Sequence, residues 1–169
     1  QSRPLETIDV NTKGLRWLLD YAVHHPIQSM LFLSSGDIYG SPPPEHIPTP
    51  ETYNGNVSPL SPRACYAEAK RLGETLCSIY HRDFGVPVKI VRPFVTYGPG
   101  LNINDKRVLG DFIRSGIQGI PIVMLTDGLD ARSYCYIADA TVAFLHVLLS
   151  NANGEVFNVA NDQQIVSIR

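Results

Sequence analysis

The sequence has little net charge and no cluster of basic residues. Its 14 Lys and Arg residues are nearly balanced by 16 Asp and Glu residues, which leaves a formal net charge of −2 over 169 residues. No run of Lys and Arg interleaved with aromatic residues is present, so the chain offers no basic surface to a phosphate backbone. We therefore expect no binding to nucleic acid.

Long apolar runs and paired cysteines are also lacking. No apolar run approaches the roughly 18 residues that a membrane span requires, and the first residues do not resemble a signal peptide. The three cysteines, Cys65, Cys77 and Cys135, are odd in number and lack metal-ligand spacing, and the five histidines are scattered. These absences predict a cytoplasmic protein with no disulfide framework, no metal site and no membrane contact.

A glycine-rich phosphate-binding motif is missing as well. Neither Gly-x-Gly-x-x-Gly nor Gly-x-x-Gly-x-x-Gly occurs among the 13 glycines. Such a motif joins a strand to a helix and holds a dinucleotide pyrophosphate at the helix N-terminus. The sequence therefore contains no recognisable pyrophosphate site of this type.

The most informative stretch predicts a helix from residue 62, with Ser61 as its N-cap and Pro62 in its first turn. Tyr66 and Lys70 are four residues apart, so they project along one line of the helix, one turn from each other. Gly73 continues this line with a small residue that leaves room for a neighbour. An ammonium beside a phenol favours the phenolate, so the pair can act as a base. A second line is apolar and is predicted to pack: Cys65, Ala69, Leu72, Leu76 and Ile79.

A buried strand is predicted at residues 29–35, an apolar run that ends in two hydroxyls. Residues 36–40 follow as a loop. In open α/β sheets, ligands bind at the carboxyl ends of the strands, so Ser34, Ser35 and Asp37 are candidate substrate contacts.

The other elements alternate between helix and strand, which predicts an α/β fold. A helix is expected at 9–25, with most of its apolar face (Val10, Gly14, Trp17, Leu18 and Tyr21) in the core. The proline-rich segment 41–62 is predicted to be a functional loop. Further strands are expected at 86–92, 121–125 and 155–159, and further helices at 106–117 and 140–150.

Three motifs in order carry a resemblance to a known family. They are residues 34–40 (SSGDIYG), residues 66–70 (YAEAK) and residues 92–100 (RPFVTYGPG). Together they resemble the extended short-chain dehydrogenase/reductase family of NAD-dependent sugar-nucleotide epimerases and dehydratases. The resemblance covers nearly the whole chain. Residues 51–57, 63–66, 70–71 and 80–82 look most like UDP-glucuronate decarboxylases, which make UDP-xylose.

The resemblance implies part of a Rossmann-like, doubly wound parallel sheet plus the start of a small substrate-binding lobe. Residues 1–100 would form the C-terminal half of the NAD-binding region, and residues 101–169 a partial substrate lobe with a returning strand. Relatives carry the glycine-rich unit in an N-terminal part, so we expect this chain to be the middle portion of a longer enzyme. A homodimer through helices near 11–25 and 62–82 is also implied.

The resemblance further implies the roles of the site residues. Tyr66 would remove the proton from a sugar C4 hydroxyl, helped by Lys70, while hydride passes to NAD. Ser35 would orient the same oxygen, and Arg132 offers a charged fork for the nucleotide sugar. The implied sets are Ser35, Asp37, Tyr66 and Lys70 for catalysis, Ser34, Tyr66, Lys70 and Pro93 for the cofactor, and Ser35, Thr96 and Arg132 for the substrate.

Several reactions remain open after the 4-keto sugar has formed. Decarboxylases and dehydratases commonly carry Glu in place of Asp37 and Asp or Ser in place of Gly36, and many relatives have Asn in place of Val95. The decarboxylases tend to have Arg in place of Gly100. The alternatives to a decarboxylase are a nucleotide-sugar 4-epimerase or 4,6-dehydratase, and, from another class, a truncated non-catalytic binding or scaffold domain.

Overall fold

The main sheet has three parallel strands in the order β1–β2–β5. The computed structural model describes residues 3–104, 107–124, 127–129, 131–163 and 165–167. β2 is buried along most of its length, as expected for a central strand that is covered on both faces. The bounds are β1 Met30–Leu33, β2 Val88–Pro93 and β5 Val156–Val159. The predicted strands at 29–35, 86–92 and 155–159 are therefore confirmed, and β2 extends through Pro93, which pairs with Val159.

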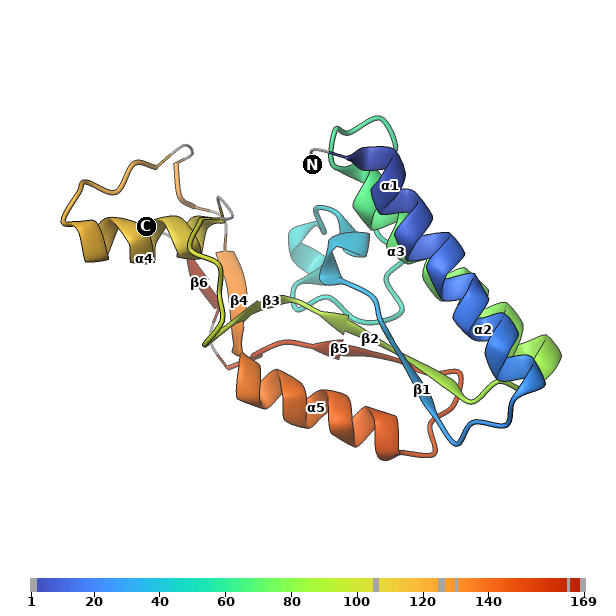
Figure 1. Ribbon diagram of the computed structural model, residues 1–169. Helices are drawn as coiled ribbons and strands as arrows, with labels where there is room; N and C mark the ends of the chain where they lie inside the picture. The colour runs from blue at the N-terminus through green and yellow to red at the C-terminus, as the bar shows by residue number, and fades with distance from the viewer. Residues whose placement is uncertain (1–2, 105–106, 125–126, 130, 164, 168–169) are drawn as a thin grey trace.

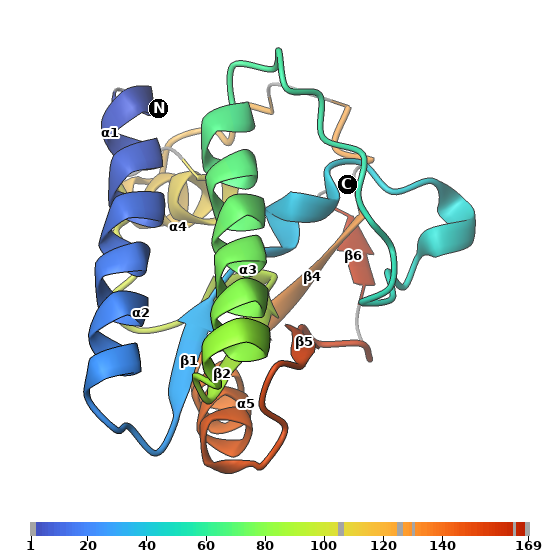
Figure 2. The same cartoon turned by 90° about the vertical axis from the view of Figure 1, so that its right-hand side faces the viewer.

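Helices cover both faces of this sheet (Figure 1). One face carries a continuous rod and α3, which run side by side in the same direction (Figure 2). The opposite face carries α5. The rod comprises α1 Pro4–Asp9, a π-helical segment Val10–Gly14 and α2 Leu15–His24; α3 is Ala64–Phe84 and α5 is Ile137–Leu149. This arrangement confirms the predicted doubly wound α/β class.

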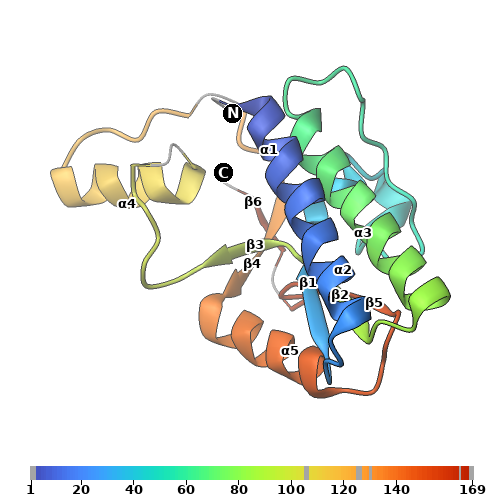
Figure 3. The ribbon, with the colours of Figure 1, turned by 45° about the vertical axis from the view of Figure 1, so that its right-hand side comes forward.

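A second, smaller sheet extends from the end of the first, with α4 beyond it (Figure 3). In this sheet β4 pairs in parallel with β3 and antiparallel with β6. The bounds are β3 Val95–Tyr97, α4 Val108–Gln118, β4 Ala131–Tyr136 and β6 Ile165–Ser167. Because β3 precedes residue 100 and β5 returns to the main sheet, the two parts interleave along the chain. A boundary at residue 100 stays a prediction.

The main core lies between the helix pair and the sheet. It includes Leu19, Phe32, Cys77 and Val88, which are all buried. A Cβ atom on Gly73 would lie only 2.5 Å from Cζ of Phe32, so only glycine lets α3 approach β1 this closely. The prediction that the line through Tyr66 and Lys70 leaves room for a neighbour is confirmed, and that neighbour is the sheet.

The predicted inward face of the first helix is wrong. Trp17, Leu18 and Tyr21 are 73%, 60% and 57% exposed. The helix is buried instead through the adjacent line of Leu15, Leu19 and Ala22. Apolar residues surround much of this helix, so periodicity did not decide which side faces the sheet.

The start of α3 and two other elements also differ from expectation. Ser61 is not the N-cap, because α3 begins at Ala64 and the Ser61 hydroxyl accepts a hydrogen bond from the Arg63 amide in the preceding turn. Leu72, expected to pack, is 48% exposed. Residues 121–124 form no strand, and Leu125 lies outside the described residues, as does Lys106 at the expected start of α4.

The segment 41–62 contains one short 3-10 turn, Pro44–His46, and is otherwise irregular, as its prolines predict. A single bridge between Gly40 and Asn56 closes the segment into a loop. Among the helices within the described ranges, none has the length and apolar character needed to cross a membrane.

Candidate active site

Lys70 joins α3 to the carboxyl end of β1. Its ammonium donates a hydrogen bond of 2.8 Å to the carbonyl oxygen of Leu33, the last residue of the strand. The ammonium also lies 5.2 Å from the ring centroid of Phe32 and 5.7 Å from that of Tyr66. Burial lowers the pKa of Lys70, because desolvation disfavours its charged form. The predicted phenol and ammonium are therefore held together at the strand end.

Ser35 begins the short turn η2, Gly36–Tyr39, directly after β1. Its side-chain oxygen accepts a hydrogen bond of 3.1 Å from the Asp37 backbone amide, which fixes the hydroxyl beside the carboxyl end of β1. Asp37 is exposed, and Gly36 is so close to the Phe94 ring that an added Cβ would lie 3.1 Å from it. Ser35, Lys70 and the start of η2 thus gather at one edge of the sheet.

The remaining predicted contacts come from neighbouring elements. Pro93 ends β2, and the Thr96 hydroxyl on β3 donates to the Phe94 carbonyl oxygen at 3.3 Å. Arg132 is an exposed residue of β4, opposite Val166 in the second sheet. Pro93 thus belongs to the main sheet, whereas Thr96 and Arg132 belong to the second sheet, and their substrate and cofactor contacts stay predictions.

The Ser34 side chain points into the protein interior. It is only 3% exposed, and its hydroxyl donates a hydrogen bond of 2.6 Å to Oε1 of Glu74. A cofactor contact by Ser34 would therefore have to come from its backbone. Its side chain belongs to a polar cluster that the sequence analysis did not identify.

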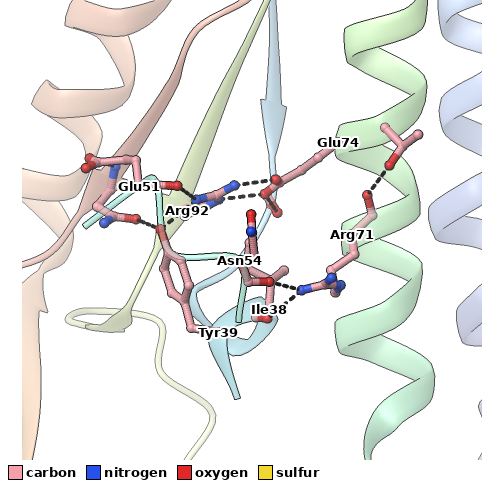
Figure 4. Close-up of polar contacts among 10 residues, drawn as sticks. Ile38, Tyr39, Glu51, Asn54, Arg71, Glu74 and Arg92 are labelled. Atoms are coloured by element: carbon pink, nitrogen blue, oxygen red, sulfur yellow. Dashed lines mark hydrogen bonds and ion pairs between the residues drawn. The ribbon is translucent and has the colours of Figure 1, made fainter. Parts of the chain in front are cut away.

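That cluster is built around an ion pair between Arg92 of β2 and Glu74 of α3 (Figure 4). The guanidinium Nε and Nη2 donate to the two carboxylate oxygens at 2.9 and 2.6 Å. Its Nη1 donates to the Tyr39 hydroxyl at 2.6 Å and to the Glu51 carbonyl oxygen at 2.9 Å. Both charged side chains are at least 86% buried, with exposed fractions of 10% and 14%.

Tyr39 and Asn158 extend the cluster to β5. The Tyr39 hydroxyl donates to Oδ1 of Asn158 at 2.8 Å, and the backbone N–H of Asn158 donates to the Glu51 carboxylate at 2.8 Å. Burial raises the pKa of Tyr39, an effect that its contact with Arg92 opposes, so the phenol is a neutral donor at physiological pH. Within the described part of the chain, every buried polar side-chain atom has a partner.

A cleft of about 400 Å³ lies beside this cluster, between α3 and residues 51–54. Its wall includes Arg71, which donates to the carbonyl oxygens of Asn54 and Ile38 at 2.5 and 3.3 Å and so ties the loop to the helix. Ser35, Tyr66 and Lys70 do not line it. The cleft is therefore separate from the candidate reaction centre.

The sequence held a signal for the cluster. Glu74 continues the four-residue spacing of Tyr66 and Lys70, and Tyr39 and Arg92 stand inside the two other motifs. Spacing along the helix places Glu74 on the same line as Tyr66 and Lys70. That Arg92 is its partner depends on how the strands are ordered in the sheet. Among the described residues, no group of three or more His, Cys, Asp or Glu side chains could hold a metal ion.

Comparison with known proteins identifies relatives over almost the whole chain. UDP-glucuronic acid decarboxylase 3 of Arabidopsis thaliana is 35% identical over 165 residues, which is 98% of this chain and 47% of that protein. UDP-glucuronic acid decarboxylase 1 of the same plant is 40% identical over 158 residues, 94% of this chain and 35% of that protein. The chain thus spans about half or less of the length of these curated relatives.

Solved structures give a similar result. The UDP-N-acetylglucosamine 4-epimerase from Methanobrevibacter ruminantium, in complex with UDP-N-acetylmuramic acid, superimposes with a TM-score of 0.88 at 25% identity and covers 99% of this chain and 52% of its own. The UDP-glucuronic acid 4-epimerase from Bacillus cereus, in complex with UDP-glucuronic acid and NAD, superimposes with a TM-score of 0.75 at 28% identity. The match covers 95% of this chain and 48% of the epimerase chain.

The match to a family agrees with the site geometry. The sequence profile described as "NAD dependent epimerase/dehydratase family" matches residues 1–160. This range includes the strand end with Ser35, the helix with Tyr66 and Lys70, and β5. The chain therefore belongs to the NAD dependent epimerase/dehydratase family.

Proposed function

We propose that the protein containing this chain uses NAD to convert a nucleotide sugar through a 4-keto intermediate, and that it decarboxylates UDP-glucuronate. The decarboxylases at 35% and 40% identity support this substrate. The observation that carries the proposal is the position of the Lys70 ammonium, between the Tyr66 ring and the end of β1 that leads to Ser35.

The residues of this chain would carry out proton transfer at the sugar C4 oxygen. Tyr66, as phenolate, takes the proton of the C4 hydroxyl, and Ser35 hydrogen-bonds the same oxygen and orients it. The Lys70 ammonium stabilises the phenolate. NAD, when bound, supplies the acceptor for the C4 hydride. The C4 ketone lies β to the C5 carboxylate, so the carboxylate can leave as carbon dioxide and its bond electrons pass into an enolate. Uptake of a proton at C5 and return of the hydride and proton to C4 and its oxygen would then give UDP-xylose.

The side chains at the strand end fit the nicotinamide end of NAD. The Lys70 ammonium has three N–H donors, and the contacts of this side chain include one hydrogen-bond acceptor, the Leu33 carbonyl oxygen. Two donors are left for ribose hydroxyl groups. Pro93, at the end of β2, would pack beside the ring. The pyrophosphate would need groups other than these.

A nucleotide-sugar 4-epimerase is the second candidate. Gly36 offers no side chain beside Asp37, and it is packed against Phe94. A 4-epimerase needs no acid–base group at that place, because it only removes and returns a hydride at C4 and the proton of the C4 hydroxyl. The likeness to two 4-epimerase structures also favours this candidate.

The test is an assay of the longest natural form of the protein with NAD and, separately, UDP-glucuronate, UDP-glucose and dTDP-glucose. The proposal expects UDP-xylose and carbon dioxide from UDP-glucuronate. UDP-galacturonate as the sole product would establish the 4-epimerase instead. No turnover of any of the three sugars, with the enzyme folded and NAD present, would reject both candidates and favour a binding or scaffold role.

A homodimer is part of the proposal. Trp17, Leu18 and Tyr21 are exposed apolar residues of α2, and Leu72 is an exposed apolar residue of α3. Exposed apolar patches of this kind mark interaction sites, and the resemblance implies a dimer through these two helices. Replacement of Trp17 by Glu should reduce the mass from dimer to monomer in light scattering. A wild-type protein that is monomeric at micromolar concentration would contradict it.

A cytoplasmic location completes the proposal. Cys65, Cys77 and Cys135 form no disulfide, and two of them are buried. Free thiols are typical of proteins in reducing compartments. Microscopy of the tagged full-length protein would test the location, and an organelle-restricted signal would contradict it.

A further inference from the structure

The Arg92–Glu74 pair connects elements that carry the candidate reaction centre but does not belong to that centre. Glu74 lies one helical turn beyond Lys70 on α3, and Ser34 immediately precedes Ser35. The Ser34 hydroxyl donates to Glu74 at 2.6 Å, so the carboxylate holds both Arg92 and the end of β1. One buried carboxylate thereby links the base-bearing helix to the turn that presents Ser35.

The pair also holds the loop that covers this edge of the sheet. Arg92 donates to the Glu51 carbonyl oxygen and to the Tyr39 hydroxyl, which places residues of the 41–62 loop and of η2 on the same guanidinium. Figure 4 shows Glu74, Arg92, Tyr39 and Glu51 converging from separate elements. Four N–H groups of Arg92 donate to acceptors on α3, η2 and the 41–62 loop, so the planar guanidinium fixes these elements relative to one another.

Stability alone does not account for such a pair. The desolvation penalty of two buried charges cancels much of their attraction, and well-packed apolar residues in their place are often as stable. An ion pair with several hydrogen bonds also fixes one relative arrangement of the elements that it joins. A catalytic site needs this, since a misplacement of about 1 Å can reduce the rate about 100-fold.

We propose that Glu74 and Arg92, through the hydroxyl of Ser34, are positioning residues that set the distance between Tyr66 and Ser35. The inference rests on the proposed function for its effect on catalysis. It assigns the Ser34 side chain to this network and not to the cofactor. If these residues only position the reaction centre, breaking the network lowers kcat but leaves the affinity for the sugar and for NAD nearly unchanged.

The decisive variant is Ser34→Ala. It removes the link from Glu74 to the strand end and leaves the ion pair intact, so no buried charge loses its partner. We expect kcat to fall 10- to 100-fold, with KM for NAD and for the sugar within about threefold of wild type. A large rise in KM for NAD with unchanged kcat would mean that the hydroxyl contacts the cofactor, and would overturn the proposal.

Ser29→Ala is the matched control. Ser29 precedes the other end of β1, where its hydroxyl donates to the Leu148 carbonyl oxygen at 2.6 Å and accepts from the Lys89 ammonium at 2.8 Å. Loss of this hydroxyl removes buried hydrogen bonds far from Ser35. We expect reduced stability but unchanged kcat. An equal fall of kcat in both variants would show that general destabilisation is the cause, and would overturn the proposal.

A double variant separates positioning from stability. Glu74→Met with Arg92→Met removes both charges together, so no buried charge loses its partner, and the variant is expected to stay folded while kcat falls at least 10-fold. Glu74→Gln with wild-type Arg92 should restore part of kcat relative to the double variant, because the amide oxygen can still accept from Ser34 or Arg92. A folded double variant with wild-type kcat would overturn the proposal.

Hydrogen exchange tests the same inference without turnover. The Asp37 amide donates to the Ser35 side chain and the Ile38 amide to the Ser35 carbonyl oxygen. In Ser34→Ala these two amides should exchange at least 10-fold faster, whereas amides in the middle of α3 should not change. If wild type turns over no nucleotide sugar, the proposed function fails and this measurement still decides: unchanged exchange at both amides refutes the positioning role.

Discussion

The Lys70 ammonium lies 2.8 Å from the carbonyl oxygen of Leu33, so the helix that carries Tyr66 is attached to the strand end that leads to Ser35. The same ammonium lies 5.2 Å from the centroid of the Phe32 ring, a second contact with β1. We therefore expect Lys70 to affect the unfolding free energy and the neighbouring Tyr66 to affect turnover, and these two effects can be measured separately.

The stability of the protein should depend on pH through Lys70. Burial lowers its pKa below the usual 10.5, so between the lowered value and 10.5 the unfolded chain binds more protons than the folded one. Folding stability contributed by this group therefore rises with pH across that window. We expect the difference in unfolding free energy between wild type and Lys70→Met to shift in favour of wild type as pH increases, measured by urea denaturation from pH 7 to 10.

Other titrating groups are common to both proteins and cancel in this difference. A constant offset is expected from the lost hydrogen bond to Leu33 and does not affect the slope. A difference that moves against wild type with increasing pH would mean that the folded protein raises the pKa of Lys70, and that the cation gains more from its surroundings than burial costs.

Removal of the Tyr66 hydroxyl should abolish most of the turnover. Tyr66→Phe keeps the ring beside the Lys70 ammonium, 5.7 Å away, but deletes the base. General base catalysis contributes about 10²- to 10⁴-fold, so kcat should fall by that factor. Urea denaturation should show a stability change within about 0.5 kcal/mol, because the residue is only partly buried. Wild-type turnover in this variant would eliminate Tyr66 as the base.

Arg132 should act on substrate affinity. A hydrogen bond to a charged group is worth about 1.5–3 kcal/mol, so Arg132→Ala should raise KM for the nucleotide sugar about 10- to 100-fold. Arg82→Ala is the control, because Arg82 is an exposed residue near the C-terminal end of α3 that pairs with Asp83 at 2.7 Å. Unchanged kinetics in Arg132→Ala would remove this residue from the substrate site.

Local patterns were sufficient to predict the elements that carry the site. The apolar run before Ser35 predicts β1, and the spacing of Tyr66 and Lys70 predicts their shared line on α3. Both signals are contained within one element, where period and end signals decide the structure. The α/β class followed from the alternation of such elements.

Features that depend on pairing between distant elements were not predictable in this way. Glu74 and Arg92 are 18 residues apart, and Tyr39 and Asn158 are 119 apart, so only the order of strands brings them together. The buried side of α2 is a similar case, since apolar residues such as Trp17 lie on faces that turn away from the sheet. Packing partners, and not periodicity, select the face that is buried.

The three thiols should differ sharply in reactivity. Cys77 and Cys135 are buried, burial raises the pKa of both, and for Cys77 the pKa reaches about 12. At pH 8 only about one Cys77 in 10,000 is a thiolate, the reactive form. Iodoacetamide should therefore alkylate the partly exposed Cys65 first, and the other two only after urea unfolding, as measured by peptide mass spectrometry. Rapid alkylation of Cys77 in the folded protein would contradict its burial.

Gly73 should be intolerant of even one methyl group, although alanine is the better helix former. In Gly73→Ala the new Cβ would lie 2.5 Å from Cζ of Phe32 and 3.2 Å from a methyl of Leu15, so α3 or the ring must move. Overpacking of a core costs about 1–3 kcal/mol, which exceeds the gain of up to about 1 kcal/mol in helix propensity. Urea denaturation should therefore show a net loss of stability.

Gly116→Ala provides the matched comparison, because Gly116 lies in α4 with nothing within 4 Å of an added Cβ. Here the propensity gain is unopposed, and stability should rise by up to about 1 kcal/mol. The double variant Gly73→Ala with Phe32→Leu should recover part of the loss, since it shortens the side chain that the methyl meets. If Gly73→Ala stabilises the protein as Gly116→Ala does, α3 does not approach β1 as closely as the Phe32 contact requires, and the link from Lys70 to Leu33 would lose its structural basis.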